Sequence, residues 1–208
     1  MEFDLKYRGL LPAATSSNKQ VPGKHHVRQV VREQLEALWA KDSRFTKIDP
    51  SKLQRGTMRE GRFDVQRPIG DVPAAWLYHH EVRGIQFVPL ITHIREARCR
   101  LAIRLFRRHP PGEIIARGGD LDNRLKTLFD ALRMPHTADE LPDGVPLGPS
   151  PFLCLLDDDA LITKVSIETF GLLTPPGPGE DADYVELDIG VDVVPVTPMW
   201  ATLDWLFP

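Results

Sequence analysis

The sequence predicts an α/β protein of the α+β type, in which a mixed β-sheet carries two principal helices on one face. Three observations predict this class. Several short segments alternate apolar with polar residues, which is the pattern of half-buried strands. Two longer segments repeat their apolar residues every three or four positions, as amphipathic helices do. Because the two kinds of segment interleave along the chain, the helices are expected to pack together on the sheet.

The N-terminal part of the chain is predicted to contain one strand, one helix and an insertion. Apolar and charged residues alternate over residues 3–8, which indicates a strand. Residues 12–23 have the composition of a turn, and the apolar positions after them predict a helix over about 25–40. Residues 41–84 are rich in charge and keep no sustained period, so we expect an irregular insertion there.

Two strands, a helix and a loop are predicted in the middle of the chain. Strands are expected at 85–91 and at 98–105, and the second has one face rich in arginine. Leucine and phenylalanine then recur at helical spacing, which predicts a helix that begins at Asp120 and continues to about Leu132. Residues 134–151 contain five prolines, which can neither continue a helix nor enter the centre of a sheet, so this segment is predicted to be a loop.

Three further strands complete the expected fold. They are predicted at 152–156, 164–168 and 185–193, with a Pro/Gly-rich segment before the last of them. A chain of 208 residues suffices for one domain of this kind. We therefore expect a single domain over 1–208, with its insertion at 41–84, its loop at 134–151 and a C-terminal tail over 195–208.

The composition excludes a membrane-spanning helix and argues against secretion. No run of 18 or more apolar residues is present. The first residues include acids where a signal peptide needs a basic region followed by an apolar one. The two cysteines, Cys99 and Cys154, lie inside predicted strands, where free thiols behave as small buried apolar groups. We expect a cytoplasmic protein without disulfides.

The charges are distributed unevenly along the chain. The formal net charge of −3, taken alone, argues against a nucleic-acid partner. Residues 1–82, however, carry a net charge of +4, residues 83–133 of +6 and residues 134–208 of −13. This asymmetry is compatible with a polyanion site and a cation site on one surface. The simpler interpretation is that both sets of charges solvate the exterior.

The first acidic motif is D-L-D-N-R-L-K at residues 120–126. With Asp120 as the N-cap of the predicted helix, Asp122 falls in the first turn and Lys126 lies one turn further along. Carboxylates at a helix N-terminus are often only caps that the helix dipole stabilises. Lys126 could likewise form an ordinary ion pair with Asp122 or Asp130, each of which is four residues away.

The second acidic motif is the run Asp157-Asp158-Asp159, which directly follows an apolar strand. In isolation it is explained by a solvated turn. Together with the first motif, it could provide the hard oxygen ligands that Mg²⁺ prefers. Such a metal can activate water and stabilise a phosphoryl displacement, and Lys126 would then face the scissile phosphate.

The two motifs resemble those of the RusA-type Holliday junction resolvases, whose pattern is D-x-D-N-x-x-K on a helix and a later D-D-[AS]-x-[IV]. The order of the surrounding strands and helices is similar to that family over more than half of the chain. The resemblance implies a RusA-like fold with insertions. It also implies a Mg²⁺-dependent homodimeric endonuclease, with Mn²⁺ able to substitute, that cuts branched DNA in recombination and repair.

The resemblance also implies roles for individual residues. By position, Asp120, Asp122 and Asp159 would be catalytic metal ligands, with Lys126 facing the phosphate and Asp158 as a neighbouring acid that shares the metal site. We choose this register because Ala160 then occupies the small position of the family pattern. In the register shifted by one residue, Asp158 would be the main ligand.

Arginines concentrate on the predicted strand at 98–105 and close to it. We interpret them as a track for DNA phosphates, although they could simply solvate one face of the strand. The candidate DNA contacts are Arg98, Arg100, Arg104, Arg107, Arg117 and Lys19.

The remaining motifs are assigned no chemistry. The pairs His25-His26 and His79-His80 lack metal-ligand spacing, so we expect them on the surface or on helix faces. A phosphatase of the haloacid type is disfavoured, because R-G-G rather than an apolar strand precedes Asp120. The Trp- and Phe-containing tail is expected to close the core, although a replication or recombination protein could instead bind it.

Two other functions remain compatible with the sequence. A protein on the same fold could bind branched or single-stranded DNA without cutting it. Alternatively, the acidic region 134–208 could bind a protein partner, but this hypothesis leaves D-x-D-N-x-x-K unexplained. The expected partners are therefore branched DNA and a second copy of the chain, with no membrane association.

Overall fold

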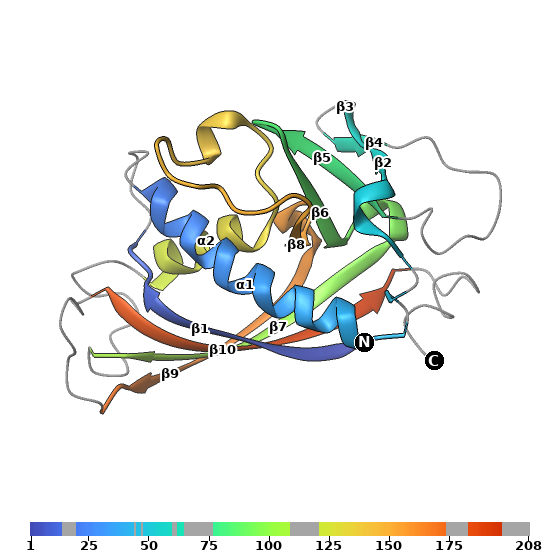
Figure 1. Ribbon diagram of the computed structural model, residues 1–208. Helices are drawn as coiled ribbons and strands as arrows, with labels where there is room; N and C mark the ends of the chain where they lie inside the picture. Colours follow the sequence, from blue (N-terminus) through green and yellow to red (C-terminus); the bar gives the residue numbers. More distant parts are fainter. Residues whose placement is uncertain are drawn as a thin grey trace.

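The described part of the molecule is a mixed α+β protein with two α-helices, two mixed four-stranded sheets and a small two-stranded hairpin (Figure 1). A computed structural model describes residues 1–13, 20–43, 45–46, 48–59, 62–64, 77–108, 121–173 and 183–196. Within these ranges no helix combines the length and the apolar character that a membrane crossing requires.

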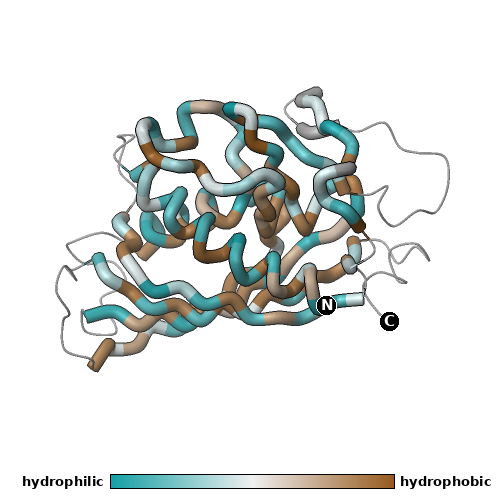
Figure 2. Tube along the Cα trace, in the orientation of Figure 1, coloured by the Kyte–Doolittle hydropathy of each residue, from teal (hydrophilic) through white to brown (hydrophobic). Residues whose placement is uncertain are grey.

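The first sheet contains the longest strands and has the order β1-β10-β7-β9. Its strands are β1 (Glu2–Leu10), β10 (Tyr184–Pro195), β7 (Ala97–Arg107) and β9 (Ile162–Gly171). β10 pairs antiparallel with both of its neighbours, whereas β9 runs parallel to β7. Along β1, β7 and β10 the side chains alternate between a buried and a more exposed face, as the alternating colours of Figure 2 illustrate. The strands predicted from this alternation are confirmed.

Both helices lie on the buried face of the first sheet (Figure 1). α1 (Val21–Lys41) begins earlier than predicted, because proline is tolerated in the first turn of a helix, where its missing N–H has no helical partner to lose. Val27, Val31 and Leu35 recur every four residues on its buried side. α2 (Leu121–Leu132) begins directly after Asp120, at the predicted position, although Asp120 itself lies outside the described residues.

The second sheet has the order β2-β5-β6-β8. Its strands are β2 (Gln54–Arg55), β5 (Tyr78–Val82), β6 (Ile85–Ile91) and β8 (Phe152–Leu156). β6 and β8 have the predicted bounds, but they pair with each other in parallel and not with the long strands. The expectation of one sheet is therefore wrong. Pairing between two segments so distant in sequence leaves no local periodicity from which it could be predicted.

The insertion at 41–84 is more ordered than predicted. It contributes β2 and β5 to the second sheet. In that sheet β2 pairs with β5, and β5 pairs antiparallel with β6. It also contains the 3₁₀ turn η2 (Pro50–Lys52) and a hairpin of β3 (Thr57–Arg59) and β4 (Arg62–Asp64). Most of these elements have two or three residues, which is too short for a recognisable sequence period.

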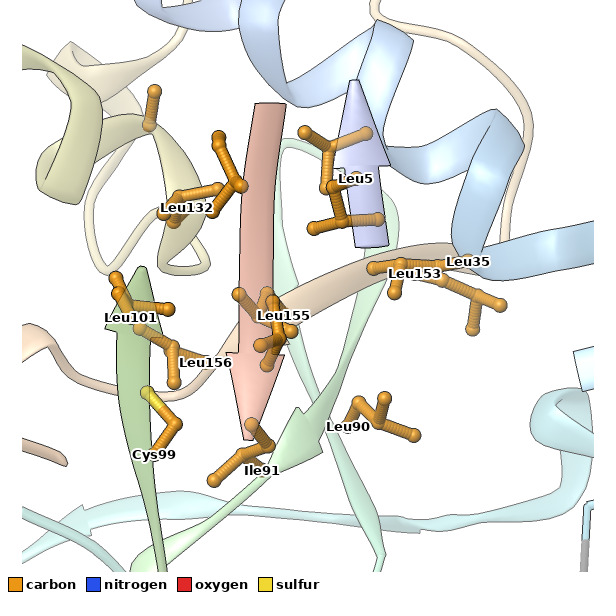
Figure 3. Packing of buried hydrophobic residues seen from close by; sticks show 14 of the residues in the cluster. Leu5, Leu35, Leu90, Ile91, Cys99, Leu101, Leu132, Leu153, Leu155 and Leu156 are labelled. Carbon is orange, nitrogen blue, oxygen red and sulfur yellow. The ribbon is translucent and has the colours of Figure 1, made fainter. Parts of the chain in front are cut away.

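The main hydrophobic core lies between the helices and both sheets (Figure 3). Leu5 of β1, Leu35 of α1 and Leu132 of α2 meet Leu153 and Leu155 of β8 in this cluster. All five side chains of β8 are buried, which agrees with the prediction of a short buried strand. The cysteines are free and buried, as expected, and burial raises the pKa of both Cys99 and Cys154 to about 12.

Residues 134–151 form the predicted loop, in which the short 3₁₀ turn η5 (Ala138–Glu140) is the one helical element. The loop is docked on α1 through its own carbonyl groups. Arg28 donates to the Glu140 carbonyl at 3.1 Å, and the ring of His25 contacts the Leu147 carbonyl at 3.1 Å. Two further 3₁₀ turns, η4 (His93–Arg95) and η6 (Asp159–Leu161), lie beside the acidic residues described next.

Candidate active site and nucleic-acid interface

Helix α2 carries the first acidic motif on its exposed side. Leu121 and Leu128 are buried in the core, whereas Asp122 and Lys126 are exposed one turn apart. Lys126 forms no ion pair with any residue that the structure describes. Asp130, which could have paired with it, instead contacts Lys24 of α1, with 2.5 Å between Oδ2 and Nζ. No described side chain therefore competes with a ligand for the ammonium group of Lys126.

A buried arginine within the motif fixes the first half of α2. Arg124 is 3% exposed. Its Nη1 donates to the carbonyl of Leu11, just after β1, and its Nη2 donates to the carboxylate of Asp183, just before β10, at 2.6 Å. This side chain therefore holds the N-terminal half of α2 against the ends of two strands of the first sheet.

A second buried arginine caps the C-terminus of α2. Arg28 of α1 donates to the carbonyls of Asp130 at 2.8 Å and of Arg133 at 3.2 Å. Carbonyls at a helix C-terminus have no helical partner, so a buried donor at this position replaces the solvent that would otherwise satisfy them. Burial lowers the pKa of Arg28, and the nearby Glu140 opposes that shift.

The three acids after β8 have different environments, which distinguishes their roles. Asp157 is buried and accepts three hydrogen bonds on Oδ2: from the hydroxyl of Tyr78 (3.0 Å), from the backbone N–H of His93 (3.0 Å) and from Nδ1 of His93 (2.6 Å). Burial and the Asp157 carboxylate raise the pKa of Tyr78. Asp157 therefore ties the end of β8 to β5 and η4, and it faces the interior.

Asp158 and Asp159 lie closer to the surface. Oδ1 of Asp158 caps η6 by accepting from the N–H of Ala160 at 2.8 Å, and Asp159 is exposed in the first turn of η6. Partial burial and the Asp158 carboxylate raise the pKa of Asp159, while Arg133 lowers it. The outward acids of the turn are thus the Asp158-Asp159 pair, which is the pair chosen from the sequence.

The acidic turn lies beside α2. The N–H of Met134, just after α2, donates to the carbonyl of Leu156 at 2.8 Å, so the end of the helix is joined to the end of β8. η6 also contacts α2, and the carboxylate of Asp130 contributes to the raised pKa of Asp159. The two acidic motifs, distant in sequence, therefore border the same helix.

The predicted metal ligands are only partly brought together. Asp130 and Asp122 are two turns apart on α2, which is about 12 Å along a helix axis, and Asp159 is close to the Asp130 end. Among the described residues, no three side chains of His, Cys, Asp or Glu gather closely enough to hold a metal ion. Asp120, the fourth predicted ligand, lies outside the described part of the chain.

The predicted arginine track is partly present on β7. Arg98, Arg100 and Arg104 lie on the more exposed face of the strand, with Arg100 and Arg104 fully at the surface. Arg107 does not join them, because it has the opposite parity along the strand and is 5% exposed. Arg117 and Lys19 lie outside the described residues.

Acidic residues of β10 neutralise much of this face. Arg100 contacts Asp192 at 3.7 Å, and Arg104 contacts Asp188 at 3.8 Å. Asp188 also binds Lys6 of β1 at 2.8 Å, so the charges of adjacent strands alternate in sign across the sheet. This face is the one that the helices leave uncovered, and it is therefore opposite to the acids on α2.

An aromatic pair and a shallow hollow complete the uncovered face. The rings of Phe106 and Phe170 are stacked 5.1 Å apart, and the guanidinium of Arg104 lies over both. A hollow of about 480 Å³ lies further along the sheet, where small side chains, among them Ala102 and Ser166, meet across the strands. The face thus combines balanced charge with some apolar surface.

Comparison with known proteins gives no relative: no protein-family model, no curated protein and no solved structure matches this chain significantly. The resemblance to the RusA-type resolvases therefore rests on the two acidic motifs and on the order of the elements around them.

Several residues that organise the site were not singled out from the sequence. Asp157, His93 and Tyr78 form a buried hydrogen-bonded group, and His136 joins it by contacting the Asp157 carbonyl at 2.8 Å. Asp157 directly follows five apolar residues, and this position was the available signal that its side chain is buried. The histidine pairs also differ from expectation, because His25 and His79 are buried, at 2% and 7% exposure.

Proposed function

We propose that this chain is a Mg²⁺-dependent endonuclease that cleaves phosphodiester bonds in branched DNA. The observation that carries the proposal is the position of the Asp158-Asp159 pair beside α2, the helix whose exposed side bears Asp122 and a Lys126 that pairs with no described residue. Metal-binding carboxylates and a lysine ammonium are groups that can stabilise the charge developed in phosphoryl transfer.

The donor set is suited to Mg²⁺. Carboxylate oxygens are the hard ligands that this ion takes. Burial first and the Asp158 carboxylate second raise the pKa of Asp159, and a divalent cation bound beside it would favour its charged form. The motif resemblance assigns Asp120, Asp122, Asp158 and Asp159 to the ion, but among the described residues Asp122 lies two helical turns from the Asp130 end of α2 and does not gather with Asp158 and Asp159. Once bound, the ion would lower the pKa of a coordinated water and stabilise the charge that develops on the phosphate.

The protein side chains have separate tasks in this proposal. Lys126 binds a phosphate oxygen of the scissile strand, where its charge favours the transition state. Asp157 holds the turn in place through Tyr78 and His93, so that the outward pair stays beside α2. Arg124 and Arg28 hold the two ends of the helix itself.

A non-cleaving DNA-binding protein is the second candidate. It is favoured by one observation, which is that Asp122 does not gather with Asp158 and Asp159 into a metal-holding group within the described residues. Both candidates bind branched DNA, and they differ in whether the DNA is cleaved.

A direct assay separates them. The full chain is incubated with labelled four-way junction, flap and linear duplex DNA, each with Mg²⁺ and with EDTA. The proposal predicts cleavage of branched DNA in Mg²⁺ and none in EDTA. Binding without cleavage under every metal condition would support the second candidate, and cleavage that EDTA leaves undiminished would refute the metal-dependent mechanism.

A further inference from the structure

Strand β9 forms an open edge of the first sheet (Figure 1). Its one sheet neighbour in the described chain is β7. The N–H of Leu172 donates to the Arg107 carbonyl at 2.7 Å, so the backbone groups of even-numbered residues on this strand point toward β7. Backbone groups alternate sides along a strand. Within the regular part of the ladder, the outward N–H and C=O groups therefore belong to Val165, Ile167 and Thr169.

Within the described residues, this edge has little of the usual protection against pairing with another strand. Natural edges are covered or interrupted by proline, bulges or inward-pointing charges. β9 contains no proline, and the apolar side chain of Val165 is 39% exposed. Its register with β7 shifts once, where Thr163 is skipped, and is regular from Lys164 to Gly171. The one lysine of the edge, Lys164, is offset by Glu168 on the same face.

The opposite edge of the sheet is closed. On β1, the N–H of Lys6 donates to Oε1 of Gln34 at 2.8 Å, and the Lys6 carbonyl accepts from Nε2 of Gln34 at 2.7 Å. The side chain of an α1 residue thus occupies the backbone groups at the middle of β1. The two edges therefore differ, and β9 is the one open to a partner.

We propose that β9 pairs antiparallel with β9 of a second copy of this chain, about a two-fold axis that passes through Ser166. In this register Lys164 lies opposite Glu168 of the partner subunit, and Val165 lies opposite Ile167 of the partner subunit. Thr163 lies opposite Thr169 of the partner subunit. Val165 and Ile167, whose backbone groups point outward, then exchange backbone hydrogen bonds with Ile167 and Val165 of the partner subunit, as an antiparallel ladder requires.

The side chains select this register over its neighbours. An axis through Val165 would place Lys164 opposite a serine and Glu168 opposite Ile162 of the partner subunit. An axis through Ile167 would place Lys164 opposite Phe170 of the partner subunit. Of these three registers, only the one centred on Ser166 places both charged residues opposite residues of the opposite charge. A two-fold interface repeats each of these pairs.

The resulting dimer has one continuous sheet of eight strands. Because the axis is perpendicular to the sheet, the helices of both copies lie on the same side. The inference rests on β9 and not on the proposed function. If that function also holds, the two acid sites face the same side of the dimer, as paired cuts in a junction require.

Charge reversal tests the register in the full chain. Sedimentation velocity or light scattering should give a dimer mass at tens of micromolar. Lys164→Glu should shift the mass toward the monomer, since it places two glutamates opposite each other, and Lys164→Glu with Glu168→Lys should restore the dimer. The single variant should still fold, because Lys164 is exposed and the new glutamate gains Arg100 of β7 as its cross-strand neighbour.

Disulfide trapping provides an independent readout. Ser166→Cys places a thiol opposite its own copy, so oxidation should yield a covalent dimer on a non-reducing gel. Lys164→Cys is the matched control, because its thiols would be about 13 Å apart along the strands and should not cross-link. The chain's own cysteines are buried. Cleavage activity is measured separately, so failure of the dimer leaves the nuclease proposal intact.

Three outcomes would overturn the proposal. The first is a monomer at tens of micromolar, and the second is a dimer mass that Lys164→Glu does not change. The third is cross-linking of the Lys164→Cys control as strongly as of Ser166→Cys. Restoration by the double variant together with selective trapping at Ser166 would establish the pairing.

Discussion

At the scale of single residues, three adjacent aspartates serve two different purposes. Asp157 belongs to the buried hydrogen-bonded group, while Asp158 and Asp159 point outward beside α2. One shift in register would exchange these roles. The assignment depends on Tyr78 and His93, which are distant in sequence and which donate to Asp157 alone of the three acids.

Replacing the buried and the exposed acid should have opposite consequences for stability. Asp157→Ala leaves the Tyr78 hydroxyl and His93 without their acceptor, and buried donors without partners cost about 1 to 3 kcal/mol. Asp159→Ala removes a carboxylate whose charged form is disfavoured by burial and by the Asp158 carboxylate. The free energy of unfolding should therefore stay unchanged or rise. Urea unfolding of both variants at pH 7.5 measures the difference. Equal destabilisation by both would contradict the division of roles.

His25 should make the protein sensitive to mild acid. Its Nε2 contacts the Leu147 carbonyl and so carries the proton, while the buried Nδ1 has no partner in the described part of the chain. Burial and Arg28 lower the pKa of His25 to about 4. The unfolded state therefore binds more protons between about pH 6.5 and pH 4, and stability falls as the pH falls through that range.

The corresponding variant is His25→Gln, which cannot be protonated. The parent should lose up to about 2 kcal/mol more stability than this variant between pH 7 and pH 5. Urea unfolding at the two pH values gives the comparison, and His26→Gln on the same helix serves as a control. A parent and a His25→Gln variant with the same pH dependence would show that His25 is not the sensitive group.

At the scale of elements, α2 is held at both ends by arginines from its surroundings and its own sequence. Arg28 supplies the donors that the C-terminal carbonyls lack, and Arg124 ties the first half of the helix to β1 and β10. The exposed side of the helix can therefore present Asp122 and Lys126 in a fixed position.

Loss of the Arg28 cap should destabilise the whole molecule. Arg28→Met keeps most of the side-chain volume but leaves several carbonyls of α2 and the following loop without donors, and we expect a loss of about 3 kcal/mol or more. Urea unfolding monitored by circular dichroism measures it. Arg32→Met, one turn further along α1, is the control and should cost much less. A loss below 1 kcal/mol for Arg28→Met would contradict a capping role.

The arginines of β7 are expected to contribute less to DNA binding than Lys126 of α2. Arg100 and Arg104 already have carboxylate partners and face away from α2, whereas Lys126 has no ion-pair partner among the described residues. A phosphate contact contributes about −0.9 to the slope of log affinity against log salt. Lys126→Ala should therefore flatten the slope by about one unit, and the double change of Arg100 and Arg104 to Ala by clearly less than two.

The measurement is a titration of a four-way junction in EDTA at several salt concentrations. Arg107→Ala is not a suitable probe, because that side chain is buried and its loss would disturb the fold. A slope that the double variant flattens by two full units would show that the arginine face binds phosphates directly.

At the scale of the whole molecule, local patterns predicted the longer elements but neither the short strands of the insertion nor the assembly of the sheets. The continuous apolar runs of β6 and β8 predicted both strands with their bounds, and the helical spacing of leucines predicted α2. The division into two sheets depends on β6 pairing with β8 and on β5 pairing with β6, and these tertiary contacts leave no periodicity in the sequence. The same holds for Asp157, whose partners come from β5 and η4.

The candidate site was predictable to the same extent. The helix position explains why Asp122 and Lys126 are exposed one turn apart, since residues four apart share a helix face. The presence of the second motif beside α2 depends on how β8 packs, which no local pattern encodes. The burial of Arg107 follows from strand parity, and its choice as a DNA contact overlooked that parity.

The measurement that tests the central claim most directly is cleavage and binding of a four-way junction by Asp159→Asn and Asp122→Asn, each beside the parent. The account predicts that cleavage in Mg²⁺ falls by orders of magnitude. Binding in EDTA should stay as tight as the parent's or tighten, because one negative charge that repels phosphate is removed. Retention of more than a tenth of the parental cleavage, or less than about 1.4 kcal/mol of lost transition-state stabilisation, would contradict it.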